Sequence, residues 1–320
     1  MRDENFKKGI LFGIISVVLV GIEPIIVISK PDRIDSFLFA AITFFTEIFI
    51  FLPFLIYEIW KNNKEELNQK VDSNKSFLSI LKKHKYFFIF IGVIFGIAQI
   101  LYNIGYSEAG AINGSIAQKT TVIFALLFGF LINNEKFNKY QIVFCLLLFF
   151  GLILAITAGS FNLLRFNLGV LILIITAMLW MFAHSLSKVY LAKNEFSPIQ
   201  IFFIRTLIST TFLLIVYFIF FPIENYELIL DPSNQIFYIS MGIAHGGSLL
   251  CWYKTLDFLG TSRSSVIDSS SPIITIIFTF LFFNKILTYF QLIGAVIVLT
   301  SIVMIFKLKK GDENQNFKKF

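Results

Sequence analysis

The sequence contains little charge and few of the residue types from which soluble enzymes build their sites. Charged residues make up 15% of its 320 residues, and there are three histidines, seven prolines and two cysteines. Soluble domains carry about 25% charged residues, so this composition excludes a soluble one- or two-domain protein and a disordered chain. Cys145 and Cys251 both lie within apolar runs and form neither a disulfide framework nor a metal-binding spacing.

Recognisable catalytic motifs are missing as well. The sequence has no HExxH, no GxSxG, no Walker loop and no GxGxxG in a strand–helix context. We therefore predict no catalytic residue, no metal site and no cofactor, and we do not expect an enzyme.

Hydrophobic residues dominate the chain. They amount to 57% of the residues, with 41 phenylalanines, and the mean hydropathy is +0.79. A membrane-spanning helix needs about 20 mostly apolar residues. We count ten such runs, which are too long and too little alternating for strands. We predict an all-α integral membrane protein with spans at 9–29, 36–60, 86–107, 111–132, 139–158, 167–191, 197–221, 235–258, 262–283 and 287–306.

The basic residues predict the orientation of these spans. If the N-terminus is cytoplasmic, 21 of the 27 lysines and arginines lie on the cytoplasmic side, four lie outside, and Lys119 and Arg205 lie within spans. The positive-inside rule then places both termini in the cytoplasm, and we expect a multi-pass protein of the plasma membrane. Orientation and contact with anionic membrane lipid account for these basic residues, and we predict no nucleic-acid partner.

The chain contains an internal repeat. Residues 110–141 match residues 260–291 at an offset of 150, and the identities include Gly110 with Gly260, Ser115 with Ser265, Asn134 with Asn284, and Gln141 with Gln291. We therefore divide the chain into a first repeat, 1–158, and a second repeat, 159–320. With five spans in each, the second repeat must insert upside down. Inverted repeats of this kind build alternating-access transporters.

Several motifs resemble those of one transporter family. They are Gly169 followed by Ala177-Met178-Leu179-Trp180, then Trp252-Tyr253-Lys254-Thr255-Leu256, then Ser271-Pro272 with Gln291-Leu292-Ile293-Gly294. The first repeat keeps Asn134-Glu135 and Gln141 but lacks the expected tryptophan and proline, and Lys285 replaces a usual glutamate. This pattern resembles the EamA type of the drug/metabolite transporter superfamily. The resemblance implies a fold of two inverted five-helix repeats and export of a small molecule, without indicating which.

Seven ionisable residues lie deep within the predicted spans. Glu47, Lys119 and His245 are near mid-depth, and Glu23, His184, Arg205 and Asp268 are within a turn or two of it. A charge near the bilayer centre costs at least about 2.5–3.5 kcal/mol, so each needs a partner or a function. Buried ion pairs would explain the set structurally, and a hydrogen-bonded core position is the commoner role for a histidine.

Polar and aromatic side chains recur at helical spacing around these charges. Such stripes favour a wetted cavity, whereas small residues alone would indicate close helix packing. Spans 5 and 10 carry no charge at depth, so we expect them to face lipid or a second copy. The candidate substrate-binding or coupling residues are Glu23, Glu47, Gln99, Tyr102, Asn103, Gln118, Lys119, Trp180, His184, Arg205, His245, Trp252, Asp268 and Ser271.

Charges of both signs at mid-depth favour a zwitterionic substrate. We predict a secondary transporter of a small metabolite such as an amino acid, with protons as the coupling ion. A cationic amine or quaternary ammonium compound is the closest rival, with Tyr102, Trp180 and Trp252 as aromatic walls. A nucleotide-sugar is less favoured because the deep cations are few. A lipid-modifying transferase is remote because the loops are short, and no pore ring indicates a channel. A monomer and a homodimer both remain open.

Overall fold

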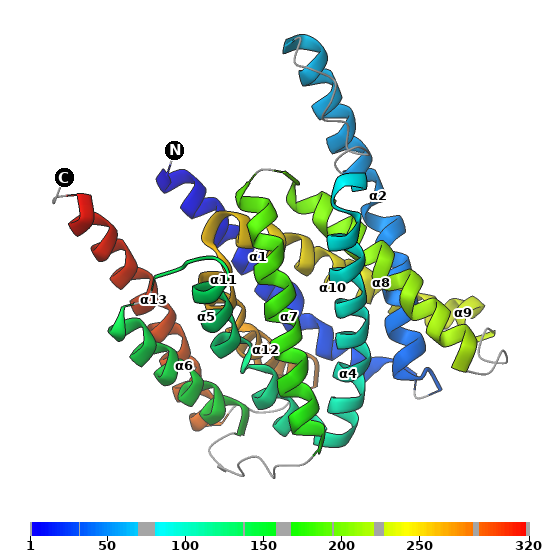
Figure 1. Cartoon of the computed structure of the whole chain (residues 1–320). Coiled ribbons are helices and arrows are strands. Elements are labelled where there is room, and N and C mark those ends of the chain that lie inside the picture. The colour runs from blue at the N-terminus through cyan, green and yellow to red at the C-terminus, as the bar shows by residue number, and fades with distance from the viewer. Residues whose placement is uncertain are drawn as a thin grey trace.

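A computed structural model describes residues 2–31, 33–69, 81–136, 138–157, 168–193, 195–220, 227–283 and 288–317. Within these ranges every extended regular element is a helix, which confirms the prediction of an all-α membrane protein (Figure 1). Among the described residues, five helices are long and apolar enough to cross a membrane. They are α1 (Arg2–Ser29), α2 (Ser36–Gln69), α4 (Lys85–Gln118), α7 (Leu168–Ala192) and α8 (Pro198–Phe220).

The remaining described helices are shorter or more polar. They are α5 (Thr121–Leu131), α6 (Lys139–Thr157), α9 (Glu227–Leu230), α10 (Pro232–Leu259), α11 (Thr261–Asp268), α12 (Ser271–Phe283) and α13 (Tyr289–Phe317). Eight predicted spans correspond to single helices, but spans 4 and 9 do not. Residues 108–118, where we expected a turn and the start of span 4, continue α4. Ala109 and Ala111 favour helix there, and no proline ends it.

Spans 4 and 9 are each interrupted at the same place in the repeat. Lys119 and Thr120 separate α4 from α5, and Ser269 and Ser270 separate α11 from α12, at the predicted offset of 150. The hydroxyl of Thr120 donates to the carbonyl of Ala117 over 2.6 Å, and Ser270 makes the equivalent 2.7 Å bond to Ile267. A hydroxyl that bonds its own backbone in this way competes with regular helix. The repeat is therefore present in the backbone as well as in the sequence.

The two repeats interlock rather than sit side by side. The first helix of each packs against the third helix of the other, so that α1 lies along α10 and α7 lies along α4 (Figure 1). Glycines permit the second contact, since a Cβ on Gly169 would lie 2.5 Å from the backbone nitrogen of Ala109. At the edge of the bundle α6 packs against α13, where a Cβ on Gly294 would lie 2.6 Å from the carbonyl oxygen of Gly151.

The repeated glutamines Gln141 and Gln291 each occupy the third position of these two edge helices. The side-chain oxygen of Gln141 accepts from the backbone N–H of Asn138, and that of Gln291 accepts from the N–H of Thr288, each over 2.9 Å. A glutamine at the third helical position that bonds back to the cap is half of a capping box. The outward faces of the edge helices are apolar, with Leu146 64% exposed, and suit lipid.

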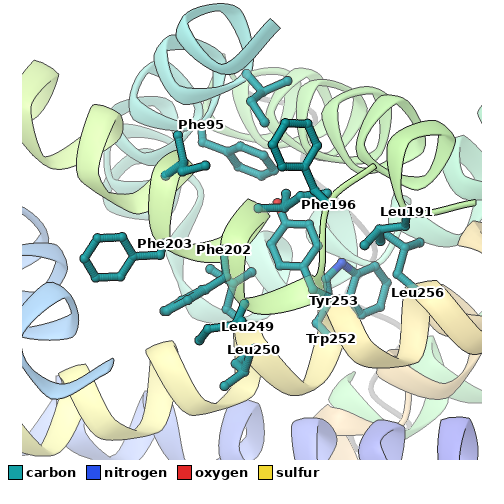
Figure 2. Packing of buried hydrophobic residues seen from close by; sticks show 14 of the residues in the cluster. Phe95, Leu191, Phe196, Phe202, Phe203, Leu249, Leu250, Trp252, Tyr253 and Leu256 are labelled. Atoms are coloured by element: carbon teal, nitrogen blue, oxygen red, sulfur yellow. The ribbon is translucent and has the colours of Figure 1, made fainter. Parts of the chain in front are cut away.

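The largest hydrophobic core lies where α2, α4, α7, α8 and α10 meet. Figure 2 shows aromatic side chains from several of these elements converging there, among them Phe196, Phe202, Trp252 and Tyr253. This core holds the helices that carry the deep polar residues in fixed positions.

Candidate functional site

A carboxylate and an imidazole meet in the interior of the bundle. The Nδ1 atom of His245 on α10 lies 2.7 Å from Oε1 of Glu47 on α2. Glu47 is completely buried, and its second oxygen has no hydrogen-bond partner. The ring of Phe44 stacks on the imidazole at a centroid distance of 5.3 Å. Among the described residues, the imidazole of His245 is therefore the hydrogen-bond partner of this buried carboxylate.

A second carboxylate approaches the next turn of α10. Glu23 on α1 places Oε1 3.1 Å from the hydroxyl of Ser248, which is also 2.8 Å from the carbonyl oxygen of His245. A serine hydroxyl has one proton to donate. When that proton is donated to the His245 carbonyl, a protonated Glu23 can donate to Ser248; when Glu23 is ionised, the serine proton turns to it. This geometry therefore accepts Glu23 in both protonation states.

Arg205 on α8 lies beside this acidic cluster, beneath a cover of aromatic rings. It is 2% exposed, and its guanidinium carbon is 4.2 Å from the ring centre of Phe95 and 5.9 Å from that of Phe44. It donates a long 3.4 Å hydrogen bond to Thr206, while its Nε has no partner. The cation is thus in contact with π faces and close to the carboxylate of Glu47.

Lys119 connects the two broken helices. Its ammonium lies 2.9 Å from the hydroxyl of Ser271, at the start of α12, and 3.5 Å from the carboxylate of Asp268, at the end of α11. Lys119 itself occupies the break between α4 and α5. The side chains of Lys119 and Asp268 are 11% and 26% exposed, so the pair is partly accessible. The structure therefore brings together candidates from both repeats.

Glu135 forms a helix cap across the repeats that was not evident from the sequence. Its carboxylate accepts from the backbone N–H groups of Thr261, over 2.7 Å, and Ser262, over 3.3 Å, at the start of α11. Asn134 has φ of 52°, a conformation that asparagine tolerates better than most residues, and Gly260 has φ of 86°. Asn134-Glu135 and Gly260 were visible as motif residues, but their contact was not.

His184 and Trp252 form a separate buried pair. The indole N–H of Trp252 donates to Nδ1 of His184 over 3.1 Å, and both residues are less than a tenth exposed. Because Nδ1 accepts, the imidazole is neutral in this arrangement. Trp252 and Phe95 belong to the aromatic core shown in Figure 2, and the ring of Phe95 lies 4.9 Å from that of His184.

An aromatic surface lies between α4 and α7. The rings of Tyr102 and Trp180 stack at 5.3 Å, and both residues are partly exposed, as is Gln99 one turn earlier on α4. Gln118 is 8% exposed, and its Oε1 has no partner. The side chain of Asn103 lies outside the described residues. Across the described ranges, no group of three histidine, cysteine or acidic side chains could hold a metal ion.

Comparison with known proteins gives two separate family matches, one in each half of the chain. The model of the EamA-like transporter family matches residues 7–157 and again residues 167–307. An uncharacterized transporter of Methanothermobacter thermautotrophicus is 23% identical over 233 residues, covering 71% of this chain and 66% of that relative's length. A solved crystal structure superposes with a TM-score of 0.71 at 13% identity, covering 94% of this chain and 97% of the other, which shows the fold.

Proposed function

Because the chain belongs to the EamA-like transporter family, and is thus a multi-pass membrane transporter, we propose that it is a secondary active exporter of small zwitterionic metabolites such as amino acids. We place it in the plasma membrane with both termini in the cytoplasm. The observation that supports a zwitterionic substrate is the presence of partly exposed groups of both signs, the acids Glu23 and Asp268 and the ammonium of Lys119.

The interlocked repeats support alternating access as the mechanism. The first repeat contacts the second along α5 and α11, from Lys119 and Asp268 to the cap at Glu135. Rocking one repeat against the other would open this seam and close the opposite side. Glu23, which the geometry accepts in both protonation states, is the residue that we assign to proton exchange.

Reconstituted protein tests this function. Proteoliposomes loaded with a radiolabelled pool of L-amino acids should release label faster than protein-free liposomes. An imposed pH gradient should change the rate of release. Glu23→Gln should retain folding and lose the response to the gradient. The control is Glu227→Gln, an exposed carboxylate on α9. A broad metabolite panel that gives no protein-dependent flux would contradict the proposal.

Cationic amines are a second candidate because of one specific contact. The stacked Tyr102–Trp180 pair presents aromatic faces of the kind that bind ammonium groups. Wild-type vesicles that transport choline but no amino acid would favour this substrate class. The Trp180→Leu variant should then lose the choline flux.

A further inference from the structure

The contact that Lys119 makes with the second repeat lies at the inner end of the α5–α11 seam. Along this seam the hydroxyl of Ser262 donates to the carbonyl of Ala125 over 3.2 Å, and a Cβ on Gly129 would lie 2.4 Å from the same hydroxyl. The seam is therefore tightly packed over its length. Lys119 directly precedes α5 and Asp268 ends α11, so their contact joins the two elements at the inner end of the seam.

Lys119 retains capacity for a ligand. An ammonium has three N–H donors, of which Ser271 and Asp268 engage two, and the Asp268 contact is long for a charged pair. A ligand carboxylate could therefore replace the Asp268 carboxylate at the same ammonium without leaving an unpaired cation.

Arg205, the other deep cation, is a poorer receptor for a carboxylate. Phe95 and Phe44 cover its guanidinium, and the residue is 2% exposed. Beside Lys119, in contrast, Gln118 has a buried amide oxygen that lacks a partner and could receive the ammonium of a ligand.

We propose that Lys119 binds the carboxylate of the substrate and that this exchange, by releasing Asp268, unlocks the α5–α11 seam. The inference rests on the proposed transport of zwitterions and adds the carboxylate site and its link to opening. The substrate carboxylate takes the place of a protein carboxylate, so the exchange changes no net charge at the site.

Hydrogen–deuterium exchange of the full chain in lipid nanodiscs tests this inference. Peptides containing residues 121–131 and 261–268 report the seam. An equimolar pool of L-amino acids should speed their exchange in the wild type, and the matched pool of amino-acid amides, which lack the carboxylate, should not. Asp268→Asn should speed exchange without any ligand, because it weakens the lock.

The informative variant is K119M/D268N, which leaves neither charge unpaired and so avoids a trivial folding defect. Without ligand its seam should already exchange as fast as that of Asp268→Asn, and any further change should require roughly ten- to a hundredfold more of the amino-acid pool than the wild type needs. The matched control is K188M/D257N, which removes an ammonium and a carboxylate 4.0 Å apart on a different helix pair and should respond like the wild type.

Three results would overturn the inference. An unchanged response of K119M/D268N, with a normal wild-type response, would exclude Lys119 as the site while leaving zwitterion transport intact. An equal wild-type response to the amides would exclude carboxylate exchange and favour amine substrates. A wild type that responds to neither pool would contradict the proposed substrate class, and the carboxylate site with it.

Discussion

Glu135 of the first repeat caps a helix of the second by accepting the backbone N–H of Thr261 over 2.7 Å. The side-chain amide of Asn133 reinforces this contact with a 2.9 Å bond to the hydroxyl of Thr261. One short segment after α5 thus satisfies backbone donors that α11 cannot satisfy itself. The contact holds the two repeats together at the end of the seam remote from Lys119.

We predict that Glu135→Ala lowers stability by about 0.5–2 kcal/mol, the range for loss of a helix cap. Thermal unfolding of the purified protein in detergent measures the change. The melting temperature of Glu135→Gln should lie between those of the wild type and Glu135→Ala, because the glutamine side chain keeps one acceptor oxygen. Glu227→Ala, at an exposed carboxylate, provides the control. A melting temperature equal to that of the wild type would show that this cap contributes nothing to the observed state.

Gly260→Ala should be more damaging than an ordinary glycine substitution. Gly260 has φ of 86° and ψ of 170°, a region that is essentially restricted to glycine and costs other residues about 1–3 kcal/mol. The new Cβ would also lie 2.7 Å from Oε1 of Glu135. Thermal unfolding should show a clear loss, while Gly247→Ala, which meets the side chain of Leu19 at 3.1 Å, should be milder. Equal effects of the two would contradict the conformational argument.

The Glu47–His245 pair should behave as one unit. Glu47→Ala leaves His245 without its partner, and we expect a loss of about 3–5 kcal/mol because Glu47 is fully buried. The double variant Glu47→Ala/His245→Ala should lose less than the sum of the single variants. Unfolding of all four proteins in detergent completes the cycle. Strict additivity would mean that the two side chains do not stabilise each other.

Asp231, at the start of α10, gives a pH-dependent prediction. Hydrogen bonds from the hydroxyl and the backbone N–H of Ser233 lower the pKa of this carboxyl, and the nearby charge of Arg33 lowers it further. Burial raises the pKa, but by less than these contacts lower it. A lowered folded-state pKa stabilises the protein above the unfolded pKa of about 3.9. This contribution is lost as the pH falls through the folded value.

The wild type should therefore exceed Asp231→Asn in melting temperature from neutral pH down to about pH 4, and the difference should shrink below that. Asparagine still accepts from Ser233, so the comparison isolates the charge. A difference that grows as the pH falls would give the wrong sign and would contradict the assignment.

The sequence predicted the features that repeat along the chain. Long apolar runs located most of the helices. The match of Gln141 with Gln291 indicated an offset of 150 residues between the repeats, and the interruptions at 119–120 and 269–270 have the same offset. The deep charges were also recognisable, since a residue such as Glu47 stands out in an apolar run. These signals are local, or depend on comparing two local segments.

Contacts between helices could not be predicted in the same way. Spans that are apolar on nearly every side do not indicate how far each helix is rotated, so the pairing of Lys119 with Asp268 was not evident. The interruptions in spans 4 and 9 extend over two residues each, and hydropathy averaged over a span does not register them. The cap at Glu135 joins residues more than a hundred positions apart, and needs the fold.

The exchange of packing partners between the repeats has a consequence for how the protein is made. Since α1 lies along α10 and α7 along α4, a ribosome must finish most of the second repeat before the first can bury its own helices. Early spans must wait in the bilayer beside lipid or a chaperone. Two separately synthesised halves should mature when both are present in one cell, and either half alone should be degraded.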